Sequence, residues 1–150
     1  MARNRFRGDA DIVAQITQFT ITGAGTAGDF VTTTINRKDI PATVPAAPTV
    51  TTVAAAVAAA LAASDVEEFT EAVWTSVGDT VYGTAATPGK PFGPPTVAVT
   101  GTVTVGAVTT PTASAGPNHW DTPENWTLNA VPVSTNDVDL IDCAVDILWG

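Results

Sequence analysis

The chain has few charged residues, and basic side chains are the scarcest of them. Lys and Arg number 6 against 15 Asp and Glu in 150 residues, which gives a formal net charge of −9. Charged residues make up 14% of the sequence, where about 25% is typical of globular domains. A broad nucleic-acid surface needs clustered Lys and Arg, so this composition disfavours DNA or RNA as a partner.

Other scarce features narrow the class of protein further. Cys143 is the only cysteine, which excludes an intramolecular disulfide and favours a small buried residue in a strand. The longest apolar run, Val53 to Ala63, is too short and too rich in alanine to span a bilayer. The polar, arginine-rich start does not resemble a signal peptide. We therefore expect no membrane partner, and synthesis in a cytoplasm without a signal peptide.

Thr, Ala, Val, Gly and Pro take the place of the missing charge, and 45% of the residues are hydrophobic. This composition favours a sheet-rich chain that hides much of its surface against copies of itself. Residues 1–11 are predicted to form an arm that carries Arg3, Arg5 and Arg7. Residues 120–150 contain acids and neither Lys nor Arg. The arm of one copy is therefore expected to dock on the acidic end of the next, rather than on a nucleic acid.

Residues 12–108 are predicted to form a β-rich module with one helix. Alternating apolar residues and turn signals predict strands at 12–21, 30–35, 40–44, 70–77, 80–85, 92–99 and 102–108. The glycine-rich stretch 23–29 is interpreted as a hairpin loop, and the prolines from Pro41 onward are expected to interrupt regular pairing.

The helix is predicted at about 50–63, within the alanine-rich stretch that begins at Thr49. Thr51 or Thr52 is the expected N-cap, and Ser64 ends the helix. Its apolar stripe is predicted to pack on the sheet and consists of Val53, Val57 and Leu61.

Residues 109–117 are expected to be a linker, followed by a second β segment at 118–150. Trp120 and Trp126 lie six positions apart in a polar turn that also contains Asn125, and a further tryptophan, Trp149, lies near the end. Alternation of acids and aliphatic residues follows them. We predict a tryptophan cap on the first rungs of a β-solenoid. The expected fold class is mainly β (α+β), a small sheet module with one alanine-rich helix and this capped segment.

Candidate chemistry is sparse, and neither a catalytic residue nor a cofactor is predicted. His119 is the only histidine and is interpreted as part of a turn. Asp121 and Glu124 form an acidic pair without a discernible pocket. A structural calcium ion is the alternative to simple surface acids for one set of residues, which lacks the spacing of an EF-hand loop. That set is Asn136, Asp137, Asp139, Asp142 and Asp146.

Two groups of motifs carry a resemblance. The stretch 30–38, the alanine-rich helix, Glu68-Phe69 and Gly89-Lys90-Pro91-Phe92 resemble a small module of tailed-bacteriophage structural proteins. The tryptophan segment from Gly116 to Trp126, with Val131-Pro132 and 145–148, resembles the part that follows this module and leads into a right-handed β-solenoid. The sequence departs from the pattern at Arg37, where the turn usually has glycine, and at Gly93-Pro94-Pro95.

The resemblance implies a virion component without catalytic residues that assembles with copies of itself. We expect a decoration protein, fibre or spike base that docks to capsid or tail proteins, with a homotrimer as the natural arrangement. The alternative is a receptor- or carbohydrate-binding fibre that stacks sugars on exposed Trp74, Trp120 or Trp126. Exposed tryptophans would favour that alternative, and buried ones would count against it. A polysaccharide-degrading enzyme is the third and weakest hypothesis.

Overall fold

The structure is a computed structural model that describes residues 3–140, apart from the side chain of Asp139. The chain divides into two compact units. The terminal unit combines the described parts of 1–15 and 113–150 with the short segment 88–91. The central unit contains residues 16–87 and 92–112. The sequence predicts consecutive segments along the chain. The two units are not consecutive, because both ends of the described chain belong to one unit.

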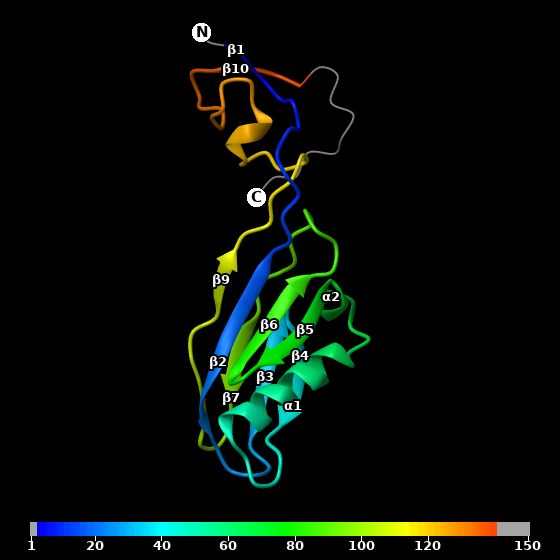
Figure 1. Ribbon diagram of the computed structural model, residues 1–150, viewed down its shortest axis with the longest axis vertical. Coiled ribbons are helices and arrows are strands. Elements are labelled where there is room, and N and C mark those ends of the chain that lie inside the picture. Colours follow the sequence, from blue (N-terminus) through cyan, green and yellow to red (C-terminus); the bar gives the residue numbers. More distant parts are fainter. Residues whose placement is uncertain (1–2, 141–150) are drawn as a thin grey trace. The chain divides into compact units, whose positions relative to one another are not determined.

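A five-stranded sheet forms one side of the central unit. Its strands run in the order β5–β6–β2–β8, and β9 also pairs with β2 (Figure 1). The strands are β2 (Ile16–Ala24), β5 (Ala72–Val77), β6 (Thr80–Ala85), β8 (Val103–Val105) and β9 (Thr109–Thr112). All their pairings are antiparallel, and β2 is the central strand. β2 pairs with β6 through Ile16–Thr20, and a register shift between Ile21 and Gly23 interrupts its pairing with β8.

A second, three-stranded sheet has the order β4–β3–β7, from Phe30–Ile35 (β3), Lys38–Thr43 (β4) and Thr96–Val99 (β7). The β3–β4 hairpin turns at Asn36 and Arg37, whose φ values are 48° and 67°. Positive φ at both turn residues is the geometry of the tight hairpin turn that matches strand twist. The tight hairpin therefore forms with arginine in place of the glycine that such turns favour.

The helix α1 spans Val50–Ala62, close to the predicted range. Thr49, rather than Thr51 or Thr52, is its N-cap: the Thr49 hydroxyl accepts from the Thr52 N–H, and the Thr52 hydroxyl accepts from the Thr49 N–H. This reciprocal arrangement satisfies two main-chain donors at the helix start. The predicted stripe is buried, and α1 packs against β4, β5, β2 and β6 (Figure 1). Packing of the helix on the sheet is thus confirmed.

The core of the central unit lies between the two sheets and α1. Its fully buried side chains come from both sheets and the helix, and include Phe19, Ile21, Val31, Ile35, Val57, Leu61 and Val81. Thr33 on β3 is also fully buried, and its hydroxyl has no hydrogen-bond partner. The short helix α2 (Glu67–Thr70) places Phe69 at the edge of this core.

In the terminal unit the two ends of the described chain pair with each other. β1 (Arg3–Arg5) pairs in parallel with β10 (Asp137–Asp139), and a 3-10 turn spans Pro123–Asn125. Phe6 and Trp126 form a further antiparallel bridge. The predicted free arm is therefore folded into a unit with the segment that follows the tryptophans.

The β-rich class is confirmed: strands make up 39% of the structure, in three sheets, with one helix of seven or more residues among the described residues. Strands 30–35 and 80–85 have the predicted bounds, and Gly78-Asp79 forms the predicted turn between β5 and β6. A β-solenoid is not shown, since β10 is the only strand after β9 within residues 3–140. The stretch with Cys143, Asp142, Asp146 and Trp149 lies outside the described residues.

Several predicted elements differ from the structure. Residues 12–15 precede β2 rather than belonging to it, and the glycine-rich stretch 23–29 connects two different sheets instead of closing a hairpin. Pro41 lies inside β4, opposite Thr32, because an edge strand does not need its N–H. The predicted linker begins with β9 at 109–112, which pairs with β2.

Candidate assembly surfaces

The tryptophan segment predicted to form a cap is the core of the terminal unit. Trp126 is fully buried; its ring makes edge contacts with Phe6 at 5.1 Å and with Trp120 at 4.5 Å between ring centroids. The indole N–H of Trp126 donates to the carbonyl oxygen of Trp120 at 2.8 Å. The 3-10 turn at Pro123–Asn125 lies between the two tryptophans in the sequence and folds the second ring back on the first.

Asn125 is the polar centre of the same unit and has no exposed surface. Its side-chain oxygen accepts from the Ala10 N–H at 2.8 Å, and its NH₂ group donates to the carbonyls of Gly116 and His119, each at 2.8 Å. One side chain thereby joins the N-terminal segment to two turns of the later segment. Asn125 and Trp126 act within the chain, so neither offers an exposed assembly contact in this structure.

The basic arm also binds within its own chain. Arg7 Nη2 donates to the Trp126 carbonyl and to Asn129 Oδ1, both at 3.1 Å, and Arg7 Nε lies 3.3 Å from Asp9 Oδ2. The β1–β10 register places Arg3 opposite Asp137. The arm and the acidic segment, which were expected to meet between copies, are therefore paired along their backbones within one chain.

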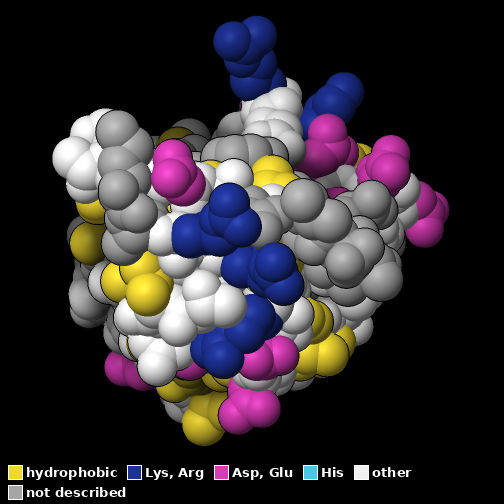
Figure 2. Space-filling model, turned by 90° about the horizontal axis from the view of Figure 1, so that it is seen from above, with side chains coloured by type: hydrophobic (Ala, Val, Ile, Leu, Met, Phe, Trp, Pro, Cys, Tyr) yellow, Lys and Arg dark blue, Asp and Glu magenta, His cyan; other side chains and the backbone are white. Residues whose placement is uncertain are grey.

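The β1–β10 register also sets the backbone of Arg5 opposite that of Asp139. Figure 2 shows several basic side chains close together near the centre of the face drawn, with acidic side chains beside them, and other basic side chains outside this group. This is not a continuous basic surface of the kind that nucleic acid requires.

Of the remaining candidate residues for chemistry, the structure brings His119 and Asp121 together. His119 is buried; its Nε2 lies 2.8 Å from the Gly89 carbonyl oxygen, and its Nδ1 lies 3.7 Å from Asp121 Oδ1. Glu124 lines a pocket of about 280 Å³ with Asp11, a pocket that Asp121 does not line.

The calcium hypothesis rests on acids that the structure describes only in part. Asn136 Oδ1 accepts from the Val133 N–H at 2.9 Å, which uses it in a turn. Within residues 3–140, no group of three or more potential metal ligands gathers.

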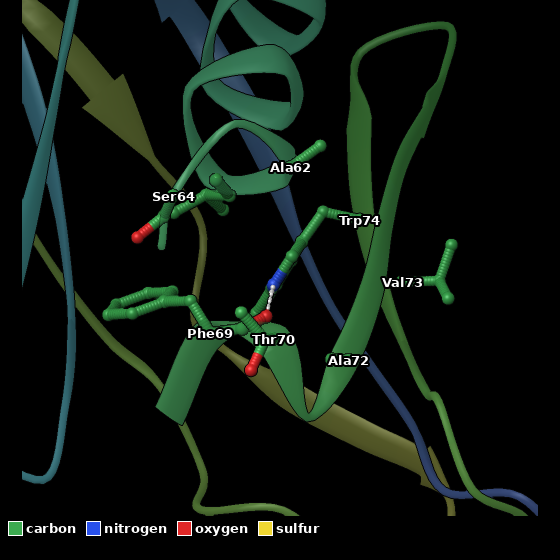
Figure 3. A pocket seen from close by; sticks show the side chains of 8 residues that line it. Ala62, Ser64, Phe69, Thr70, Ala72, Val73 and Trp74 are labelled. Atoms are coloured by element: carbon green, nitrogen blue, oxygen red, sulfur yellow. Dashed lines mark hydrogen bonds between the residues drawn. The ribbon is translucent and has the colours of Figure 1, made fainter. Parts of the chain in front are cut away.

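A second pocket, of about 300 Å³, lies in the central unit beside β5 (Figure 3). It is lined by Leu61, Ala62, Ser64, Phe69, Thr70, Ala72, Val73 and Trp74. None of these side chains is titratable, so the pocket suits an apolar side chain and provides no acid or base. Sequence reasoning missed it because its walls come from three separate elements.

Trp74 belongs to the interior of the central unit. Its side chain is 5% exposed, and its indole N–H donates to the Phe69 carbonyl at 3.0 Å (Figure 3). Gly83 lies opposite it on β6, where an added Cβ would come within 2.7 Å of the indole ring. Two of the three tryptophans proposed as sugar platforms are therefore buried, and the third, Trp120, is half-buried against Trp126.

A carboxylate fixes the connection between the two sheets. Asp29 Oδ2 accepts from the N–H of Thr26 at 2.9 Å and from the N–H of Thr102 at 2.8 Å. The hydrogen bond from the Thr26 backbone, followed by that from Thr102, lowers the pKa of Asp29 below its ordinary value of 3.8. Gly101, at φ 77°, provides room for this carboxylate. Asp29 is thus a structural acid that closes the glycine-rich stretch.

The outer face of the five-stranded sheet is formed by strands without charged residues. None of the residues in β2, β5, β6, β8 and β9 is charged, although the chain carries −9. Val73 and Val77 on β5 are 56% and 69% exposed. Val73 and Trp74 point to opposite sides of β5 (Figure 3). The acids of the central unit lie outside this sheet, so the sheet offers a neutral surface with exposed valines at its edge.

Comparisons with known proteins do not assign the chain to a family. No protein-family model matches the chain, and no curated protein matches it at a significant level. Within residues 3–140, no helix has the length and apolar character to cross a bilayer.

Proposed function

We propose that this chain is a structural component of a tailed-bacteriophage particle that assembles with copies of itself and docks to capsid or tail proteins. The observation that carries the proposal is the neutral five-stranded sheet with its exposed valines, in a chain of net charge −9. Interfaces are depleted of charge at their centres, and like-charged copies approach most easily through neutral faces.

The proposal names a phage particle because the module and the tryptophan segment resemble phage structural proteins. The terminal unit supports the proposal in a second way, because it is itself a compact folded unit rather than a loose arm. A decoration protein, fibre base and spike base all fit such a body. The predicted homotrimer belongs to this proposal.

The carbohydrate-binding alternative has no supporting observation among the described residues. It needs exposed aromatic faces, and Trp74 and Trp126 are 5% and 0% exposed. Tyr82 on the outer sheet face is half-buried and stands without a second aromatic ring in contact in the described part of the chain.

The test is whether the chain co-purifies with phage particles. Virions purified by density gradient from a host that carries the gene are analysed by mass spectrometry, and electron cryomicroscopy locates ordered copies. We expect the chain in fixed stoichiometry with the capsid or tail proteins. A chain that separates from particles and stays monomeric at every concentration would overturn the proposal.

A further inference from the structure

The sheet edges of the central unit are protected unequally. An exposed edge strand presents unpaired N–H and C=O groups, and proteins blunt such edges with proline, charge or short length. β4 contains Lys38, Asp39 and Pro41, and β9 contains Pro111. β8 is three residues long and β7 is four. β5 has six residues, AVWTSV, with no proline and no charge.

The hydrogen-bond pattern identifies which groups of β5 are free for another strand. The Ala86 N–H donates to the Glu71 carbonyl, and β5 and β6 continue in the same register. Because hydrogen bonding alternates along antiparallel strands, Val73, Thr75 and Val77 bond to β6. The main-chain groups of the other three residues, Ala72, Trp74 and Ser76, point to the open side. No other main-chain partner of these groups is found among the described residues.

We propose that β5 pairs with β5 of a second copy, antiparallel and across a two-fold axis at Thr75. This inference rests on the self-assembly proposed above. Because a two-fold contact joins copies in pairs, it is a contact other than those that would close a homotrimer. In this register, the open groups of Trp74 bond to those of Ser76 in the second copy. Val73 lies opposite Val77 twice, on the outer face where both side chains are exposed. The two five-stranded sheets then form one continuous sheet.

We assign the strand that pairs with the open edge of β5 to a second copy of the chain, because β5 is complementary to itself. Its pattern reads Val73–Thr75–Val77 on the outer face, which is symmetrical about Thr75. A neutral strand also lets two chains of −9 meet without placing their charges in the middle of the contact. At the ends of the register, Glu71 lies opposite Asp79 of the second copy. The contact is therefore weakened by like charges at its borders and strengthened by salt.

The contact is small, which sets the conditions of the test. Stable interfaces bury roughly 1,200–2,000 Å², and one edge strand from each copy, with four valines between them, covers less. Free chains should therefore pair weakly, and many copies held on one particle should pair firmly through their effective concentration. Sedimentation equilibrium over a wide concentration range is the suitable measurement.

A disulfide test reads the register directly. Residues in a non-hydrogen-bonded antiparallel pair have Cα atoms about 4.5 Å apart, which falls within the range that a disulfide spans. In a Cys143→Ser background, Thr75→Cys should give a disulfide-linked dimer under mild oxidation. Val73→Cys on the same face is the control and should remain largely unlinked. Both positions are exposed, so the variants should fold.

A charge test reads the affinity. Thr75→Lys places two like charges opposite each other and should weaken pairing about tenfold or more. Thr43→Lys, at an exposed threonine of β4, should leave pairing unchanged. Asp79→Asn should strengthen pairing, most clearly at low salt.

The outcomes separate this contact from the proposed function. A Thr75→Cys dimer together with weakened pairing in Thr75→Lys supports the contact. If trimers or larger assemblies form equally well with either Thr75 substitution, the β5 contact is overturned and the proposal of self-assembly remains. Capture of a different particle protein at β5 also overturns the pairing of copies. Monomers at every concentration, absent from particles, overturn both.

Discussion

Replacing Asn125 should unfold the terminal unit while leaving the central unit intact. The Asn125 side chain makes three hydrogen bonds of 2.8 Å, to Ala10, Gly116 and His119, and it has no contact with solvent. In Asn125→Ala, one N–H and two carbonyl oxygens lose their partner inside the unit. The cost of leaving a buried polar group unsatisfied is about 1–3 kcal/mol for each group.

Water that enters the vacated space recovers part of this cost, so we expect a loss of about 3–5 kcal/mol. Whole domains have a free energy of unfolding of about 5–15 kcal/mol, and the terminal unit has one helical turn and two three-residue strands. A loss of this size should therefore leave it largely unfolded. Asn118→Ala is the matched control, because Asn118 lies in the same unit and is only half-buried.

Hydrogen exchange measured by mass spectrometry distinguishes the two units. In Asn125→Ala, amides of 3–11 and 113–140 should lose protection, while those of β2 and β6 should retain it. Equal protection in Asn125→Ala and Asn118→Ala would refute the assignment of Asn125 as the link between the two ends. Loss of protection throughout both units would refute their independence.

Asn125→Asp adds a pH signature to the same argument. A carboxylate still accepts from the Ala10 N–H, but it faces the carbonyls of Gly116 and His119 without protons to donate. Burial and these acceptors raise the pKa of the new acid in the folded state above its value of about 3.9 in the unfolded chain. Stability contributed by the protonated form is present at low pH and lost as the pH rises through the folded pKa. The variant should therefore be closest to wild type near pH 4 and least stable at pH 8, by urea denaturation.

Four further substitutions test single features of the central unit by urea or thermal denaturation. Thr33→Val should stabilise it by about 1 kcal/mol, because it removes a buried hydroxyl without a partner; a loss of stability would reveal a bond to that hydroxyl. Arg37→Gly should add about 0.5–1 kcal/mol, because a left-handed arginine costs more than the extra entropy of glycine in the unfolded chain. Gly83→Ala should cost about 1–3 kcal/mol through the clash with Trp74, and a neutral result would show that the ring moves freely. Asp29→Asn should be destabilising at pH 7 and progressively less so as the pH falls below 3.8: the lowered pKa of Asp29 stabilises the fold above pH 3.8, and that stability is lost as the pH falls through the folded pKa.

The central unit was the more predictable part of the fold. β3 and β6 were predicted with their observed bounds, and burial alternates along both strands. The helix α1 follows from its alanine content and apolar stripe. The assignment of strands to two sheets was not predictable from such patterns. The loop 23–29 has the glycine content of a hairpin, but Asp29 holds it to Thr102, about seventy residues away in the sequence. Local periodicity carries no information about a partner at that separation.

The candidate sites were less predictable, because an aromatic residue in a polar segment has two opposite explanations. Trp126 lies among Asn, Thr and Glu in sequence, which favoured a role at the surface. The polar neighbours instead hydrogen-bond the backbone around the ring: Asn125 does so from inside the unit and Thr127 from its border. The distinction depends on what covers the ring, and the ring is covered by Phe6, which is distant in sequence.

The same comparison shows why assembly should use the sheet rather than the arm. Opposite charges at the two ends of the chain suggested contacts between copies, but those ends also belong to one molecule. A segment tethered in the same chain competes at a much higher effective concentration than a segment of another copy. The pairing of Arg3 with Asp137 through β1 and β10 is the expected result of that competition. The β5 edge has no such partner among the described residues, which is why we propose this edge, rather than the arm, as the place where a strand of a second copy pairs.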